Sequence, residues 1–339
     1  MRIVCLCLGL IVSASAFAAG PGTQYRLAHS YVLGGDGGWD YLNFDAAGHR
    51  LFISRGTKIQ VVDPEKDTLL GEVPTGNGAH GAALAPELDK GFTSNGRDDS
   101  VTVFDLKTLK VTNTIKLSGQ GPDAFAYEPL TKRVFFFNGR SGNASVVDAV
   151  TEKEIAVIPL DGRPEFAAVD GKGHVYVNIE SKSELSEIDA AKAAITKTWS
   201  LAPCESPSGL SMDTLHRRLF SGCDNRLMAV SDPDAGKVVA TLPIGEGVDA
   251  TGFDPGTQLA FSSNGEGSLT VIHEDGPDKY TVVQDAVTRK FARTMTLDPA
   301  SHKVYLVTAD VKVEPAPAGQ RPKRTVLPGT FTVLVMAPQ

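Results

Sequence analysis

Several features that mark other protein classes are scarce in this sequence. After the first 18 residues, no apolar run is long enough to cross a lipid bilayer. Lys and Arg total 33 against 40 Asp and Glu, a formal net charge of −7, so we expect no general binding to nucleic acids or anionic membranes. No segment has a sustained helical period with capping residues, which favours an all-β chain.

Motifs of common enzyme classes are also absent. The sequence has no G-x-S-x-G elbow and no P-loop or dinucleotide fingerprint. The glycine-rich stretch at 34–38 leads into a predicted strand rather than a helix, so it does not fit a phosphate-binding loop. His80 has no nearby His or Cys partner of the kind that zinc sites use. These absences favour a protein without catalytic activity.

The sequence contains four cysteines, and two of them, Cys5 and Cys7, lie in the N-terminal segment. Arg2, an apolar run at 3–12 and the Ala-Phe-Ala at 16–18 predict a secretory signal peptide over residues 1–18. Its removal would give a periplasmic or secreted product without a membrane span. Cys204 and Cys223 then remain, and an even count in an exported chain predicts one disulfide; two buried free thiols are the alternative.

The remaining chain is built from one repeated pattern. An apolar residue, a turn with Asp, Pro or Gly and a second apolar strand recur at intervals of 40 to 44 residues. The seven copies lie at 44–54, 84–94, 127–137, 169–178, 212–222, 253–263 and 297–307. Each copy except the last continues with a tight turn and two more alternating strands.

Four strands per repeat predict a seven-bladed β-propeller, a single domain over residues 19–339. One blade has little core of its own, so neighbouring blades must bury its apolar faces. The last copy offers three strands, at 293–298, 302–308 and 330–336. We expect the N-terminal run at 25–33 to supply the fourth strand and to close the ring.

The repeats resemble those of the YncE-like, YVTN-type seven-bladed β-propellers. The resemblance lies in the D-P-x-x-x-x-(V/L)-(F/Y) hairpin and in strands such as VTVFDL at 101–106, which follows the Asn-Gly of 95–96. It covers the whole mature chain and implies an exported propeller. It assigns no reaction, because fold alone does not define function.

Candidate site residues follow from the repeat, since the first strands of all blades begin at one face of the central channel. Polar or charged groups occupy most of these starts, where a small residue would be enough for packing. They are Asp40, His80, Asp123, Glu165, Asp249 and Arg293. We expect them to bind a polar ligand at the channel mouth; hydration of an open channel is the alternative.

The loops that join second and third strands should lie at the same face. Arg97 and Arg140 occupy matching positions there and predict a small positive patch. The recurring asparagines are interpreted as turn formers that bond their own backbone and tolerate positive φ. They are Asn95, Asn138, Asn178 and Asn264.

One of these loops is unusually long. The insertion at 311–329 contains EPAPAGQRPKR, which is rich in proline and basic residues. A long loop among short ones is typical of a lid or binding loop. It would bring Arg321, Lys323 and Arg324 to the channel mouth; a solvated surface loop is the alternative.

Two functions fit these patterns. The first is an exported binding protein of the bacterial cell envelope, with a small polar ligand or an envelope protein at the mouth. The second is a lactonase-like hydrolase that depends on Ca²⁺ held by Glu165 and Asp249 with loop asparagine oxygens, since Ca²⁺ takes six to eight oxygen ligands.

Overall fold

The structure is a computed structural model that describes residues 23–314 and 323–339. The predicted signal peptide at 1–18 and Arg321 lie outside these described residues. The described chain forms antiparallel strands almost throughout, with two short 3₁₀ turns, η1 (Pro86–Leu88) and η2 (Glu180–Lys182). Within the described ranges, no helix has the length and hydropathy of a membrane span.

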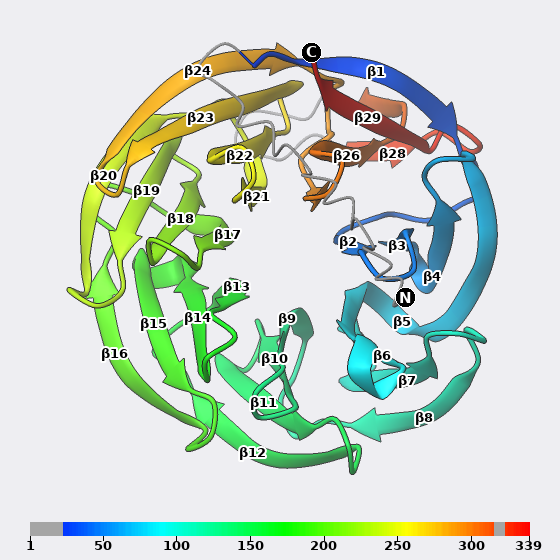
Figure 1. The fold of residues 1–339 in the computed structure, drawn as a ribbon. Helices are drawn as coiled ribbons and strands as arrows, with labels where there is room; N and C mark the ends of the chain where they lie inside the picture. The colour runs from blue at the N-terminus through cyan, green and yellow to red at the C-terminus, as the bar shows by residue number, and fades with distance from the viewer. Residues whose placement is uncertain (1–22, 315–322) are drawn as a thin grey trace, which may run out of the picture.

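The strands form sheets that surround a common centre, as Figure 1 shows. Four of the sheets contain four consecutive strands each. These are β9 (Pro122–Glu128), β10 (Arg133–Asn138), β11 (Asn143–Asp148) and β12 (Lys153–Pro159); β13 (Pro164–Val169), β14 (His174–Ile179), β15 (Glu184–Asp189) and β16 (Ala194–Ser200); β17 (Pro207–Asp213), β18 (Arg218–Cys223), β19 (Leu227–Asp232) and β20 (Lys237–Pro243); and β21 (Val248–Asp254), β22 (Leu259–Asn264), β23 (Ser268–Gly276) and β24 (Lys279–Val287).

A seven-stranded sheet contains two further units of four strands. Its long strand β5 (Thr68–Ala85) pairs with β4 through its first half and with β6 through its second half, so it serves both units. The other strands are β2 (Leu42–Asp45), β3 (Arg50–Ser54), β4 (Gly56–Asp63), β6 (Lys90–Asn95), β7 (Ser100–Asp105) and β8 (Val111–Lys116).

The last unit combines the two ends of the described chain. It has the order β1-β29-β26-β25, from β1 (Tyr25–Val32), β29 (Thr332–Pro338), β26 (Lys303–Thr308) and β25 (Met295–Asp298). Strand β1 runs antiparallel to β29. It lies at the outer edge, whereas strands such as β9, β13, β17 and β21 are innermost (Figure 1). With this unit, seven four-stranded units match the seven sequence repeats.

Burial follows the position of each strand in its unit. Strands β10 and β11 are almost fully buried, whereas the outer strand β12 alternates between exposed and covered residues. Phe135 and Phe137 of β10 pack in one cluster with Val175 and Val177 of the next sheet. Apolar surface is therefore buried between neighbouring units, as the repeat requires.

Cys204 and Cys223 form a disulfide, with their Cα atoms 5.7 Å apart. Cys204 precedes β17 and Cys223 ends β18, so the bond ties the entry of this unit to its second strand.

Candidate functional site

A β-bulge positions the candidate residues in five of the units. The pairing of the first and second strands shifts at His80, and again at Asp249, where an extra residue stands on the inner strand. The same shift recurs around Asp123, Glu165 and Ser208. A bulge redirects a side chain from the face of a sheet. Here it turns one polar residue per unit toward the centre.

Serine hydroxyls hold these starts in place. Ser54 Oγ accepts a 2.9 Å hydrogen bond from the backbone N–H of Asp40. Ser94 Oγ donates to the carbonyl of Asp123 at 2.7 Å, across the boundary between two units. The positions of the site residues are thus fixed by neighbouring units as well as by their own strands.

The polar side chains surround a central chamber of about 330 Å³. Tyr41 forms part of its wall, and its ring packs in a tilted arrangement against Phe166, with ring centroids 4.3 Å apart, and against Phe125 at 5.3 Å. On the other side of these rings lies a second cavity of about 400 Å³, lined mainly by apolar residues. The aromatic layer therefore separates a charged chamber from an apolar one. The chamber residues are Asp40, Tyr41, Asp123, Arg163, Glu165, Glu180, Ser208, Asp224, Val248, Asp249 and Arg293.

His80 connects two of the carboxylates. Its Nδ1 lies 2.6 Å from Oδ2 of Asp40 and 3.1 Å from Oδ1 of Asp123. Burial lowers the pKa of His80, but the hydrogen bond to Asp40 and the nearby carboxylate charges outweigh it and raise that pKa to about 9. Burial also raises the pKa of Asp123. These three groups come from consecutive units.

The opposite wall holds the arginines. Arg293 Nε lies 3.1 Å from Oδ2 of Asp249, and Ser208 Oγ donates to Oδ1 of Asp249 at 3.0 Å. Arg163 contacts Glu165 at 3.5 Å and also pairs with Glu180. Burial, assisted by the charge of Asp123, raises the pKa of Glu165 to about 8, and burial raises that of Asp249.

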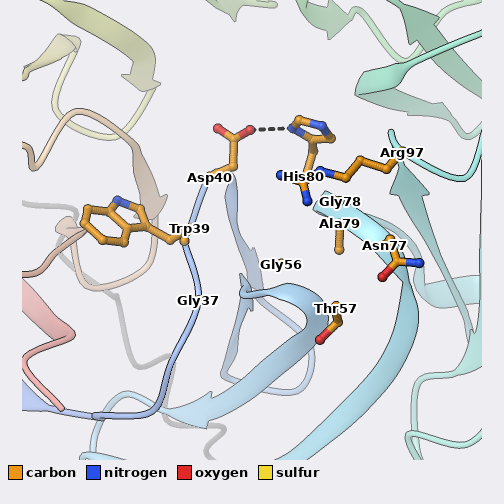
Figure 2. Close-up of a pocket in the computed structure, with 11 residues that line it drawn as sticks. Gly37, Trp39, Asp40, Gly56, Thr57, Asn77, Gly78, Ala79, His80 and Arg97 are labelled. Atoms are coloured by element: carbon orange, nitrogen blue, oxygen red, sulfur yellow. Dashed lines mark hydrogen bonds and ion pairs between the residues drawn. The ribbon is translucent and has the colours of Figure 1, made fainter. Parts of the chain in front are cut away.

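A side cavity of about 400 Å³ adjoins the chamber, shares Asp40 with it and is also lined by His80 (Figure 2). Glycine backbone forms much of its wall, and Trp39 and Arg97 also line it. The Arg97 guanidinium has no hydrogen bond or ion pair within the described residues.

Not all predicted residues reach the chamber. Arg140 pairs with Asp99 and is not among the chamber residues, so Arg97 and Arg140 do not form one patch there. Lys323 lies 4.0 Å from Glu314 and is largely exposed. Arg324 lies over the ring of Phe291 at 5.0 Å, in a cavity of about 260 Å³ that also contains Arg293.

The insertion differs from an extended loop. Its described residues form a two-stranded hairpin of β27 (Val311–Glu314) and β28 (Lys323–Val326) beside the mouth. Apolar Val311 and Val313 alternate with Lys312 and Glu314 along β27, a pattern typical of a strand, and β27 pairs with β28 over four residues.

The interpretation of the asparagines was wrong in its mechanism. None of the four has positive φ, and all are buried. Asn95 Nδ2 donates to the hydroxyls of Ser100 and Thr102, and Asn264 donates in the same way to Ser268 and Thr270. These side chains lock the second hairpin. Asn178 instead donates to the carbonyls of Ser208 and Gly209 in the next unit. Because all four side chains are used in such bonds and do not line the chamber, the described residues do not place asparagine oxygens around Glu165 and Asp249 for Ca²⁺.

Three ligand-bearing residues instead come together at the chamber wall. One atom from each of Asp40, His80 and Asp123 lies within 4.8 Å of the others. A second such group, Asp213, His216 and Glu274, lies away from the chamber between two neighbouring units. The sequence did not predict that Arg163 and Glu180 line the chamber. Glu180 lies in the loop between β14 and β15, which is the type of loop that we expected at the channel mouth.

Comparisons with known proteins bear on the fold alone. Neither the family models nor the curated proteins contain a match to this chain. Among solved structures, a structure of U3-55K matches with a TM-score of 0.78 and 9% identity, over 92% of this chain and 99% of that one. A crystal structure of RRP9 WD40 repeats matches with 0.78 and 8% identity, over 93% and 99%. The chain therefore has a β-propeller fold, similar to that of the WD40 repeats, and membership of the YncE-like family stays a prediction.

Proposed function

We propose that this chain is an exported, non-catalytic binding propeller whose central chamber takes a small ligand that carries positive charge. One observation carries the proposal. The chamber is lined by six carboxyl groups, from Asp40, Asp123, Glu165, Glu180, Asp224 and Asp249, against two guanidinium groups, from Arg163 and Arg293. A cleft with such an excess of one sign attracts and concentrates ligands of the other sign.

Burial strengthens this preference. Asp249 and Glu165 are only 14% and 15% exposed in their side chains. Burial raises the pKa of both groups even though Arg293 and Arg163 lie beside them, so a further positive charge would stabilise their ionised forms. A bound cation supplies that charge. Export, a single domain over 19–339, closure of the ring by β1 and kinship with YncE-like propellers belong to the same proposal.

The ligand could be a free amine or a lysine side chain of an envelope protein, because both present an ammonium group. Thermal unfolding with putrescine, glutarate and glucose tests the shared chemistry. A ligand that binds only the folded state raises the midpoint, so putrescine alone should do so. A rise with glutarate alone, or with none of the three, would reject the proposal.

A further inference from the structure

The wall formed by Asp40, His80 and Asp123 has the composition of a metal site as well as of an ion-pair cluster. Nδ1 of His80 faces both carboxylates, at 2.6 and 3.1 Å. The other ring nitrogen, Nε2, lies against Gly96, where an added Cβ would come within 2.7 Å of it. The ring orientation is therefore fixed by packing, with its available nitrogen between two carboxylate oxygens.

Tyr41 is a second, independent observation that indicates a ligand. Tyr41 is 7% exposed, and within the described residues its hydroxyl has no hydrogen-bond partner. It lies in the wall of the same chamber, and the carboxylates of Asp123, Glu165, Asp40 and Asp249 act on it electrostatically. The Tyr41 hydroxyl is not among the buried polar atoms that lack a partner, so it is accessible from the chamber and available to form a hydrogen bond there. A water or ligand atom in the chamber would provide the partner.

We propose that Asp40, His80 and Asp123 bind one divalent first-row transition-metal ion, such as Mn²⁺ or Zn²⁺, with an open coordination side toward the chamber. This inference rests on the proposed function, and it specifies the positive charge as a metal. An imidazole nitrogen with two carboxylates suits these ions, whereas Ca²⁺ takes oxygen ligands. The pairing of Arg293 with Asp249 leaves the guanidinium charge compensated by its own carboxylate. The open side would take water or a donor atom of an exogenous ligand.

Titration of the metal-stripped protein with MnCl₂ and ZnCl₂ by calorimetry tests the site, and Co²⁺ absorption in the visible range reports its coordination. We expect one equivalent to bind. His80→Gln and Asp123→Asn should each weaken binding by roughly 100-fold, since each removes one of three ligands. Gly96→Ala should also weaken it by displacing the ring while all three ligands are kept.

His302→Gln is the matched control, because His302 Nδ1 contacts one acid, Asp254 at 2.7 Å, and His302 belongs to neither group of ligand-bearing residues. It should leave metal binding unchanged. The inference is overturned if neither ion binds, if binding survives His80→Gln, or if Ca²⁺ binds more tightly than Mn²⁺ and Zn²⁺. If putrescine stabilises the protein but no metal binds, only this inference fails; if neither binds, the proposed function fails with it.

Discussion

At the residue scale, Arg55 shows how a charged side chain can be structural in a fold of this kind. It is 2% exposed, and its guanidinium lies 3.7 Å from the centre of the Phe331 ring. It donates to four successive carbonyl groups, those of residues 34–37. This explains how the glycine-rich stretch enters the first blade without a phosphate or another ligand.

Arg55→Lys should therefore lower the free energy of unfolding by about 2 kcal/mol, because a single ammonium cannot bond all four carbonyls. Urea unfolding measures the loss, and amide hydrogen exchange at 34–38 should increase. Arg97→Lys is the control, since Arg97 is exposed and unpaired within the described residues. Equal stability of the two variants would contradict the structural role of Arg55.

Glu165 differs from Arg55, because its negative charge lowers the stability of the folded state. Its pKa rises in the folded state from 4.5 to about 8, mainly through burial. Below the ordinary value the carboxyl is protonated in both states. Between about 4.5 and 8 the folded state binds more protons than the unfolded state, so stability falls as the pH rises through this window.

Glu165→Gln should remove this part of the pH dependence. At pH above 8, we expect the variant to be more stable than the natural protein by about 2 kcal/mol or more, from the size of the shift. Denaturant unfolding on both sides of the window measures it. A variant that is less stable than the natural protein at high pH would show that the Glu165 charge is well compensated without a ligand.

At the scale of strands and hairpins, the sequence predicted the four-strand repeat because alternation and turn residues recur in every copy. It did not predict the bulges at His80 and Asp249, because a bulge inserts one residue without a distinctive residue type. The candidate residues could thus be chosen, but not their mutual distances. The sequence did not predict the hairpin stem of β27 and β28, because the prolines of that loop are not typical of paired strands.

The disulfide belongs to this scale, since Cys204 and Cys223 enclose one hairpin with a sequence separation of 19. The double variant Cys204→Ser with Cys223→Ser should lose about 3 kcal/mol by the loop-entropy relation. Chemical unfolding with and without reductant measures it. If reductant destabilises the double variant as much as the natural protein, the effect does not come from this bond.

At the scale of the whole molecule, stability depends on how the first strand joins the last unit. Tyr25 of β1 is fully buried, and its hydroxyl donates to the carbonyl of His302 at 2.8 Å. Its ring packs edge-on against Phe261 at 5.0 Å, and Gln284 of the preceding unit accepts a 2.7 Å hydrogen bond from its N–H. One residue near the start of the described chain therefore contacts two units near its end.

Tyr25→Ala should reduce the free energy of unfolding by about 3–5 kcal/mol, as for other large-to-small changes in a core. Leu27→Ala on the same strand is the control, because Leu27 is 43% exposed and should cost far less. Thermal and urea unfolding compare them. If the two variants lose the same stability, β1 does not contribute to closure in the proposed way.

The central claim is that the chamber binds positive charge, and calorimetric titration with putrescine tests it most directly. We expect one molecule to bind per chain, and Glu165→Gln to weaken the affinity by about tenfold through loss of one buried charge partner. The control Glu246→Gln changes an exposed carboxylate that pairs with Arg226 outside the chamber and should leave the affinity unchanged. No binding, or equal binding by Glu165→Gln and the natural protein, would contradict the account.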